Sequence, residues 1–337
     1  MPLISKKKEI YPIYEPLRAY LRRYQKEIQT EVSYDDLLRY TSSISLYDSK
    51  GKDTLWETLF YAPTEMNLIY GALKKIYARL KAEGDMAVIE HLFVDRVDLC
   101  TYGNTKPIRV RIVNRINDNF DYFYVKRADA SRVYGLELED LTSPGRVMHF
   151  VSGETLIEEH IAGVPGEQFI EQYMGVRLNK TRLAKEFVKF NERCFVRLLG
   201  DMHANNYVID ITPDFEEIHY RIRAIDFDQQ SYEGRLKVYQ PKYFKENNAI
   251  IQLGLETMTP ETTKQYQVEE RSMIARRIRS AYQQMQHLLA AMKQENLAPE
   301  GNIITLRESL YSYYSHKRFL KCKTMGELLE ASFWMLF

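Results

Sequence analysis

LGDMHANN (residues 199–206) and DFD (residues 226–228) are the two stretches that decide the fold. An Asp, an Asn five positions later and a second Asp after an apolar run are typical of phosphoryl-transfer sites. In such a site Asp201 would orient the proton of an attacking hydroxyl. Asn206 and Asp226 would supply the hard oxygen ligands that Mg²⁺ prefers. We therefore expect these side chains to converge on one divalent ion.

The length, apolar content and net charge of the chain limit the kinds of protein it can be. The chain has 337 residues, of which 45% are hydrophobic, and a formal net charge of +1. This length allows one large domain or two to three ordinary ones, and the apolar content argues against a disordered chain. A nearly neutral chain has no global field that attracts nucleic acid or an anionic membrane, so we expect neither as a partner.

The cysteines and the N-terminal stretch bear on location. Cys100, Cys194 and Cys322 are far apart and odd in number, which predicts neither a disulfide framework nor a metal site. The N-terminus does not resemble a cleaved signal peptide, and no run of about 18 apolar residues could span a bilayer. We expect a cytoplasmic protein, although a secreted effector without a cleaved signal would have the same features.

Residues 1–85 are expected to form a helical extension. Apolar residues have helical spacing within 17–28 and again within 64–83, and the polar stretch 48–52 between them predicts a turn. The extension would pack on the domain that follows or serve as a separate binding element.

From residue 86 the pattern favours strands. Three β-rich stretches separated by turn-like connectors predict an antiparallel meander, followed by one helix and two further strands. The expected strands are 91–100, 108–113, 120–125, 147–151 and 155–161, and the helix is 130–141.

Beyond residue 163 the chain is expected to be mostly helical. A helix over 183–198 would run into Gly200, and strands at 207–211 and 220–225 would follow the loop. The remainder includes a long amphipathic stretch over 268–295. The C-terminal helices, like the N-terminal extension, could contact a protein partner.

This order of elements resembles the protein-kinase-like superfamily. The local motif Gly-Asp-x-His-x-x-Asn, present as Gly200, Asp201, His203 and Asn206, is most similar to the aminoglycoside and choline phosphotransferase branch and to atypical bacterial members. The resemblance implies an α+β bilobal kinase-like fold with a helical N-terminal extension and a helical C-terminal lobe. It predicts an extension at 1–85, an N-lobe with an antiparallel sheet at 86–163 and a C-lobe with the catalytic loop at 164–337.

The resemblance also implies roles for single residues. Asp201 would be the catalytic residue, and Asn206 and Asp226 would bind Mg²⁺ at the ATP phosphates. Asp228 would reach a second metal ion or cap the next segment, and His203 would brace the loop. Lys126, at the end of a strand, would bind phosphate and would be held by a carboxylate. Glu137 is the preferred partner of this lysine, and Glu139 is the alternative.

The nucleotide base and the phosphate loop complete the expected site. Backbone groups of Glu158, Glu159, His160 and Ile161 would pair with adenine. Between the first two kinase-like strands there is only one glycine, Gly103, where the family has a glycine-rich loop.

The implied function is ATP- and Mg²⁺-dependent phosphoryl transfer to a hydroxyl of a small molecule or protein. One alternative keeps the fold but transfers AMP. Another is a pseudokinase, which would bind nucleotide or regulate a partner without catalysis.

Overall fold

The computed structural model describes residues 8–81, 86–102, 105–175, 178–214 and 218–337. They form two compact units, and each unit is assembled from separate stretches of the chain. The first unit contains residues 8–20, 130–146 and 161–337, and the second contains residues 21–129 and 147–160. This division differs from the three successive segments that the sequence predicts.

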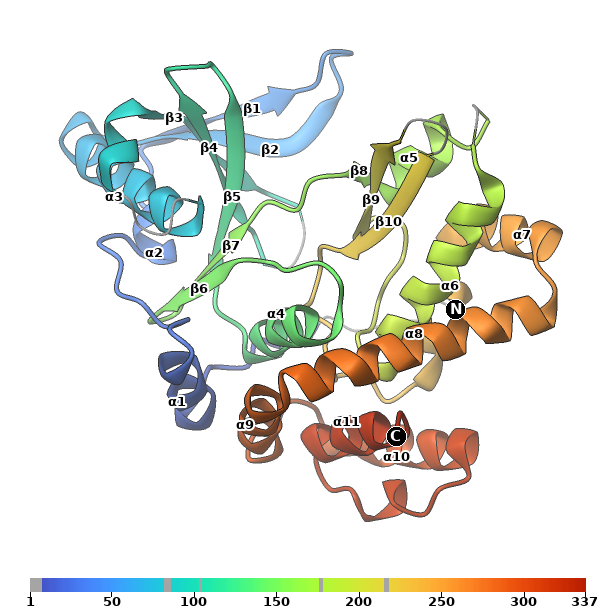
Figure 1. Cartoon of the computed structure of the whole chain (residues 1–337). Helices are drawn as coiled ribbons and strands as arrows, with labels where there is room; N and C mark the ends of the chain where they lie inside the picture. Colours follow the sequence, from blue (N-terminus) through green and yellow to red (C-terminus); the bar gives the residue numbers. More distant parts are fainter. Residues whose placement is uncertain (1–7, 82–85, 103–104, 176–177, 215–217) are drawn as a thin grey trace. The chain divides into compact units, whose positions relative to one another are not determined.

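An antiparallel seven-stranded sheet dominates the second unit (Figure 1). Its strand order is β1-β2-β3-β4-β5-β7-β6, and neighbouring strands pair antiparallel throughout. The meander predicted from residue 91 onward is therefore confirmed. The strands are β1 (Ser42–Tyr47), β2 (Asp53–Phe60), β3 (Leu92–Cys100), β4 (Ile108–Asn114), β5 (Phe120–Arg127), β6 (His149–Ser152) and β7 (Thr155–Glu159).

Helix α3 (Pro63–Lys81) buries the core of this unit. Its residues Ile69, Leu73, Ile76 and Leu80 recur every three or four positions and pack in one cluster with inward-facing residues of β3 and β4. The helix expected over 64–83 is thus confirmed. Two short helices, α2 (Tyr34–Leu37) and η1 (Met86–His91), complete the unit.

The hairpin of β1 and β2 corrects the expectation of a purely helical extension. The turn predicted at 48–52 is present, and the Asp48 carboxylate accepts hydrogen bonds from the backbone N–H groups of Lys50 and Lys52 at 2.8 and 2.9 Å. Strands rather than helices flank this turn. Because most hairpin side chains are exposed or half-buried, the sequence lacks the strong apolar alternation that signals a strand.

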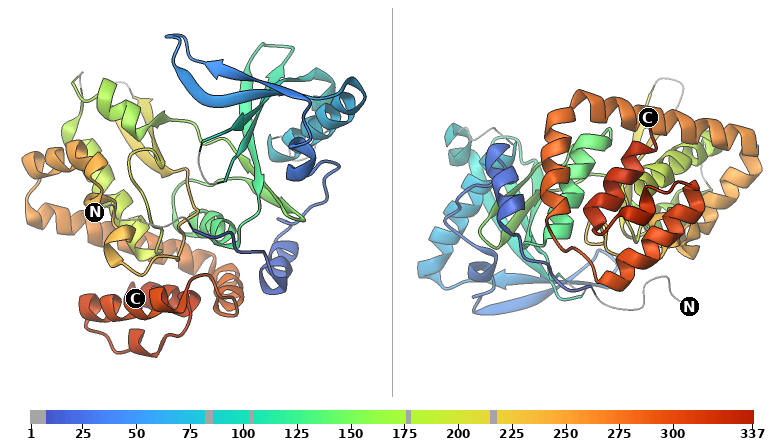
Figure 2. Two further views of the ribbon diagram at one scale, coloured as in Figure 1. Left: turned by 180° about the vertical axis from the view of Figure 1, so that it is seen from behind. Right: turned by 90° about the horizontal axis from the view of Figure 1, so that it is seen from below.

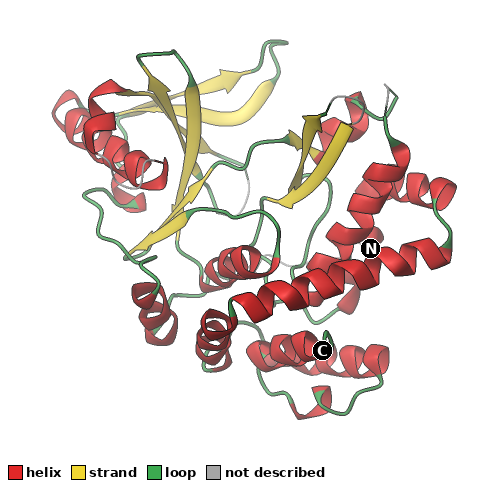
Figure 3. Ribbon diagram, viewed as in Figure 1, coloured by secondary structure: helices red, strands yellow, loops and turns green. Residues whose placement is uncertain are grey.

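Helices make up most of the first unit, around a small sheet of order β10-β9-β8 (Figure 3). The long stretch expected over 268–295 is two helices that meet at Ala281. No helix in the described part of the chain has the length and apolarity to cross a bilayer. The remaining elements are α1 (Glu15–Arg23), α4 (Ala130–Thr142), β8 (Val164–Pro165), α5 (Gly166–Gln172), α6 (Lys180–Val196), β9 (Tyr207–Pro213), β10 (Ile218–Ala224), η2 (Leu236–Tyr239), η3 (Pro241–Tyr243), η4 (Lys245–Asn247), α7 (Asn248–Thr257), α8 (Pro260–Ser280), α9 (Tyr282–Lys293), α10 (Glu300–Tyr314), η5 (Phe319–Lys321) and α11 (Met325–Trp334).

Helix α6 leads the chain into the loop at residues 199–206. Its apolar stripe, which includes Leu183, Phe187 and Phe190, is buried, and the helix packs against α7 and α8 (Figure 2). At the C-terminal end Leu198 has a left-handed backbone with φ 56°, which turns the chain out of the helix. The predicted α+β class is confirmed, with an antiparallel sheet followed along the chain by a mostly helical region.

Candidate functional site

The loop between α6 and β9 holds Asp201 in a fixed conformation. Asp201 has φ 62°, and its backbone N–H donates to the carbonyl of Val238 at 3.1 Å. Its carbonyl accepts from the backbone N–H of His203 at 2.9 Å and from Nδ2 of Asn206 at 2.7 Å. The loop therefore carries its own hydrogen bonds, and the Asn206 amide helps to close it around Asp201.

The Asp201 carboxyl lies in an acidic environment. Burial, followed by the nearby charges of Asp226, Glu233 and Glu246, raises its pKa to about 7. A carboxyl group with such a pKa can accept a proton and release it again near neutral pH, as a group that orients a reacting hydroxyl must do.

His203 braces the same loop, as the sequence predicts. Its Nδ1 lies 3.3 Å from the backbone N of Asn205, which donates to it, and its carbonyl accepts from the backbone N–H of Asn206 at 2.9 Å. Burial lowers the pKa of the imidazole, which keeps the ring neutral and able to accept this bond.

The DFD loop adjoins this segment and is bound by an arginine from helix α4. Arg132 Nη1 donates to Oδ1 of Asp226 at 2.8 Å and to Oδ1 of Asp228 at 2.9 Å. Its Nη2 donates to the carbonyl of Ile225 at 3.2 Å. Arg132 is only 2% exposed. Two of the three predicted metal ligands therefore share one buried cation.

These contacts bear on whether Mg²⁺ fits the predicted ligands. Oδ1 of Asp226 accepts from Arg132 and also from the backbone N–H of Asp228 at 3.0 Å. Asn206 donates through Nδ2 within the loop, so its oxygen Oδ1 is the atom that would bind a metal ion. Across the residues that the structure describes, no group of three or more His, Cys, Asp or Glu side chains could hold a metal ion. With Arg132 in place, Oδ1 of Asp226 does not fit a divalent ion, and Mg²⁺ binding by the predicted ligands stays a prediction.

Close packing sets the position of Arg132. Gly135 lies one helical turn further along α4, and a Cβ atom added there would stand 2.8 Å from Cβ of Phe227. Only glycine allows this approach. The same face of α4 therefore covers the DFD motif with Gly135 and binds its two carboxylates with Arg132.

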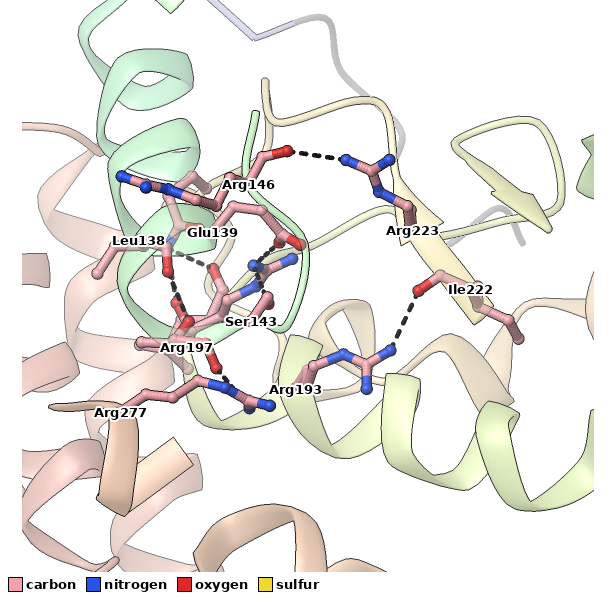
Figure 4. A network of polar contacts seen from close by, with 12 residues as sticks. Leu138, Glu139, Ser143, Arg146, Arg193, Arg197, Ile222, Arg223 and Arg277 are labelled. Carbon is pink, nitrogen blue, oxygen red and sulfur yellow. Dashed lines mark hydrogen bonds and ion pairs between the residues drawn. The ribbon is translucent and has the colours of Figure 1, made fainter. Parts of the chain in front are cut away.

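A network of polar contacts anchors the far end of α4 (Figure 4). Arg197, at the end of α6, forms an ion pair with Glu139 and donates to Oγ of Ser143 at 3.1 Å. Glu137 accepts from the hydroxyl of Tyr20 at 2.6 Å. The two glutamates predicted as alternative partners of Lys126 thus both have partners within the first unit.

Lys126 has a partner within the second unit. Its Nζ lies 2.9 Å from Oε2 of Glu158 on the adjacent strand, and both residues are buried. The sequence assigns Glu158 to the adenine-binding segment and does not anticipate this ion pair. The roles of Lys126 in phosphate binding and of Glu137 as its partner stay predictions.

The predicted adenine-binding segment continues strand β7. The backbone N–H of Glu159 donates to the carbonyl of Met148 at 2.9 Å, and that of His160 donates to the carbonyl of Tyr122 at 3.3 Å. These two N–H groups are used within the sheet. Ile161 is buried, and the predicted phosphate-loop glycine, Gly103, lies outside the described residues.

Three buried polar residues near the loop were not identified from the sequence. Besides Arg132, Gln230 donates through Nε2 to the carbonyls of Arg197 and Leu198 at 2.6 and 3.2 Å. Asn247 donates through Nδ2 to the carbonyl of Met202 at 3.0 Å. Gln230 stands two positions after the DFD motif, which is a usable signal, whereas nothing in the local sequence marks Asn247.

Comparisons with known proteins add little to this description. No family model matches the chain, and no curated protein matches its sequence. The autoinhibited serine kinase domain of the giant muscle protein titin has a TM-score of 0.29 and 14% identity, over 72% of this chain and 92% of that chain. A structure of titin kinase and its flanking domains has a TM-score of 0.28 and 14% identity, over 71% of this chain and 53% of that chain.

Proposed function

We propose that the protein is a kinase-like phosphotransferase that moves the γ-phosphoryl group of ATP to a hydroxyl. The observation that supports this proposal most is the setting of Asp201, whose backbone makes three hydrogen bonds and whose carboxyl pKa is raised to about 7. In the proposed reaction its carboxylate orients the acceptor hydroxyl and takes its proton as the oxygen attacks the γ-phosphorus, and the bond from that phosphorus to the bridging oxygen breaks to release ADP. Lys126 would bind the ATP phosphates.

The acceptor that suits this site best is a small cationic molecule. Besides Asp226 and Asp228, which pair with Arg132, Glu233 and Glu246 also act on Asp201 as negative charges, so the surroundings of the reacting group are acidic. A cationic alcohol such as an aminoglycoside or an amino alcohol would be attracted to these charges. This preference agrees with the motif resemblance to the aminoglycoside and choline phosphotransferase branch.

The test is transfer of label from ATP by the full chain. ATP labelled at the γ-phosphate would be incubated with the protein, divalent metal and a panel of aminoglycosides and amino alcohols. We expect labelled acceptor with the native chain, and a loss of about 10²-fold or more with Asp201→Asn, which removes the charge with little change in shape. Label transferred from α-labelled ATP instead would indicate AMP transfer. Equal rates for native and Asp201→Asn chains would contradict the mechanism.

A second candidate is a nucleotide-binding module without phosphoryl transfer. Its support is Arg132, which engages both carboxylates of the DFD motif. A rise in melting temperature with ATP but no transfer to any acceptor would favour this candidate, because a ligand that binds only the native state must stabilise it.

A further inference from the structure

At the DFD motif, where a metal ion is predicted, the structure places the guanidinium group of Arg132. A single guanidinium nitrogen, Nη1 of Arg132, lies 2.8 and 2.9 Å from carboxylate oxygens of Asp226 and Asp228. The Arg132 side chain is 3% exposed, whereas those of the two aspartates are 36% and 20% exposed. A buried guanidinium thus bridges two carboxylates that still reach solvent.

Arg132 would compete with a divalent ion that binds through Oδ1 of Asp226 or Oδ1 of Asp228. A metal ion binds carboxylate oxygens at about 2.0–2.6 Å and repels a cation held beside it. Oδ1 of Asp226 already accepts two hydrogen bonds, one from Arg132 and one from the backbone N–H of Asp228. A metal ion at this oxygen requires that the guanidinium leave.

The surrounding structure opposes such a departure. Gly135 brings α4 against Phe227 with no room for an added Cβ, and Glu139 fixes the same helix to Arg197. Arg132 also donates to the carbonyl of Ile225, so its guanidinium is held from more than one side. The arginine is therefore positioned by packing as well as by charge.

We propose that Arg132 takes the place of a metal ion at Asp226 and Asp228 and decides whether this motif accepts a divalent cation. The native chain then has no divalent-ion site that depends on Asp226, and replacement of Arg132 creates one. This inference rests on the proposed function only in that the kinase-like motif gives these aspartates the role of metal ligands.

The test is a Mn²⁺ titration of the full chain, followed by the electron paramagnetic resonance signal of free Mn²⁺. Native, Arg132→Gln, Asp226→Asn and the Arg132→Gln/Asp226→Asn double variant would be compared. Arg271→Gln serves as the control, because it removes another arginine that forms an ion pair, with Glu192, and leaves the DFD motif unchanged. Circular dichroism would verify that each variant is folded.

We expect Arg132→Gln to bind Mn²⁺ about tenfold or more tightly than the native chain. This gain should disappear in the double variant, and native, Asp226→Asn and Arg271→Gln chains should bind alike. Native Mn²⁺ binding that is weakened by Asp226→Asn and not strengthened by Arg132→Gln would overturn the proposal.

Two further readings keep the outcome decisive. If Arg132→Gln does not fold, the native and Asp226→Asn titrations suffice. Native Mn²⁺ binding with a Kd of about a millimolar or lower that Asp226→Asn removes would overturn the proposal. Equal Mn²⁺ binding by the two chains would support it. The titration contains no nucleotide or acceptor, so a chain without transferase activity would still give its result. Failure of the proposed function and failure of this inference are therefore distinguishable.

Discussion

Helix α4 makes an ionic contact near each end, and the two contacts differ in their access to water. Near its C-terminal end Glu139 pairs with Arg197, and the two side chains are 6% and 2% exposed. Near its N-terminal end Arg132 pairs with Asp226 and Asp228, whose side chains are 36% and 20% exposed. An ion pair that water cannot reach has no alternative partner and acts as scaffold. At the other contact water reaches the carboxylates although the guanidinium is held in place, and this partial access to solvent suits a functional site.

The largest effect should follow from breaking the buried pair. Arg197→Gln leaves the Glu139 carboxylate buried without its cation, and we expect a loss of about 3–5 kcal/mol in the free energy of unfolding. Urea denaturation followed by circular dichroism measures it. Ser143→Ala, which removes only a neutral acceptor of Arg197, should cost about 1 kcal/mol. A similar cost for both variants would mean that the ion pair contributes little.

A third carboxyl group beside α4, that of Glu295, is buried, and its contacts among the described residues are with neutral groups and not with a cation. Glu295 accepts from the backbone N–H of Leu17 at 3.2 Å and interacts with Tyr134 of α4, and burial raises its pKa to about 7. A raised carboxyl pKa means that the folded state holds its proton more tightly. The associated stability is thus present at low pH and is lost as pH rises from about 4.5 to 7.

We expect the raised pKa of Glu295 to lower the free energy of unfolding by up to about 3 kcal/mol as the pH rises through this range. Glu295→Gln stays neutral, so the difference in unfolding free energy between native and variant chains should change in favour of the variant between about pH 5 and pH 8. Urea denaturation at both pH values measures this change. A difference that is independent of pH would contradict a raised pKa at this residue.

Of the two ionic contacts, the partly solvated one should give the smaller loss in the free energy of unfolding. Arg132→Gln leaves Asp226 and Asp228 able to bind water, and we expect it to cost about 1–2 kcal/mol. Mn²⁺ should recover stability in Arg132→Gln and not in Arg197→Gln, since only the former exposes two neighbouring carboxylates. Thermal melts with and without Mn²⁺ check this. An equal rise in melting temperature with Mn²⁺ in both variants would contradict the view that only the Arg132 contact lies at carboxylates that a metal ion can reach.

The parts of the fold that the sequence predicts are those that depend on local patterns. The spacing of apolar residues located α3 and α6, and turn residues separated the strands of the meander. The hairpin of β1 and β2 was missed because its exposed faces carry little apolar alternation. No local pattern shows that each compact unit is assembled from separate stretches of the chain, because that depends on which distant stretches pack together.

The site shows the same limit. The loop motif indicated the bracing role of His203, since its contacts are with residues close in the chain, and the catalytic role of Asp201 stays a prediction. Arg132 is 94 positions from Asp226, and no local pattern shows that the first turn of α4 contacts that loop. The ion pair of Lys126 with Glu158 depends in the same way on strand pairing across 32 positions.

The left-handed backbone at Asp201 has a consequence for how such a chain changes over evolutionary time. Asn tolerates this conformation better than most residues and has the shape of Asp without its charge. A lineage could exchange the carboxylate for an amide here and keep its loop and core intact. Loss of chemistry and loss of structure are therefore separable at this position, and an inert descendant would remain a well-folded protein.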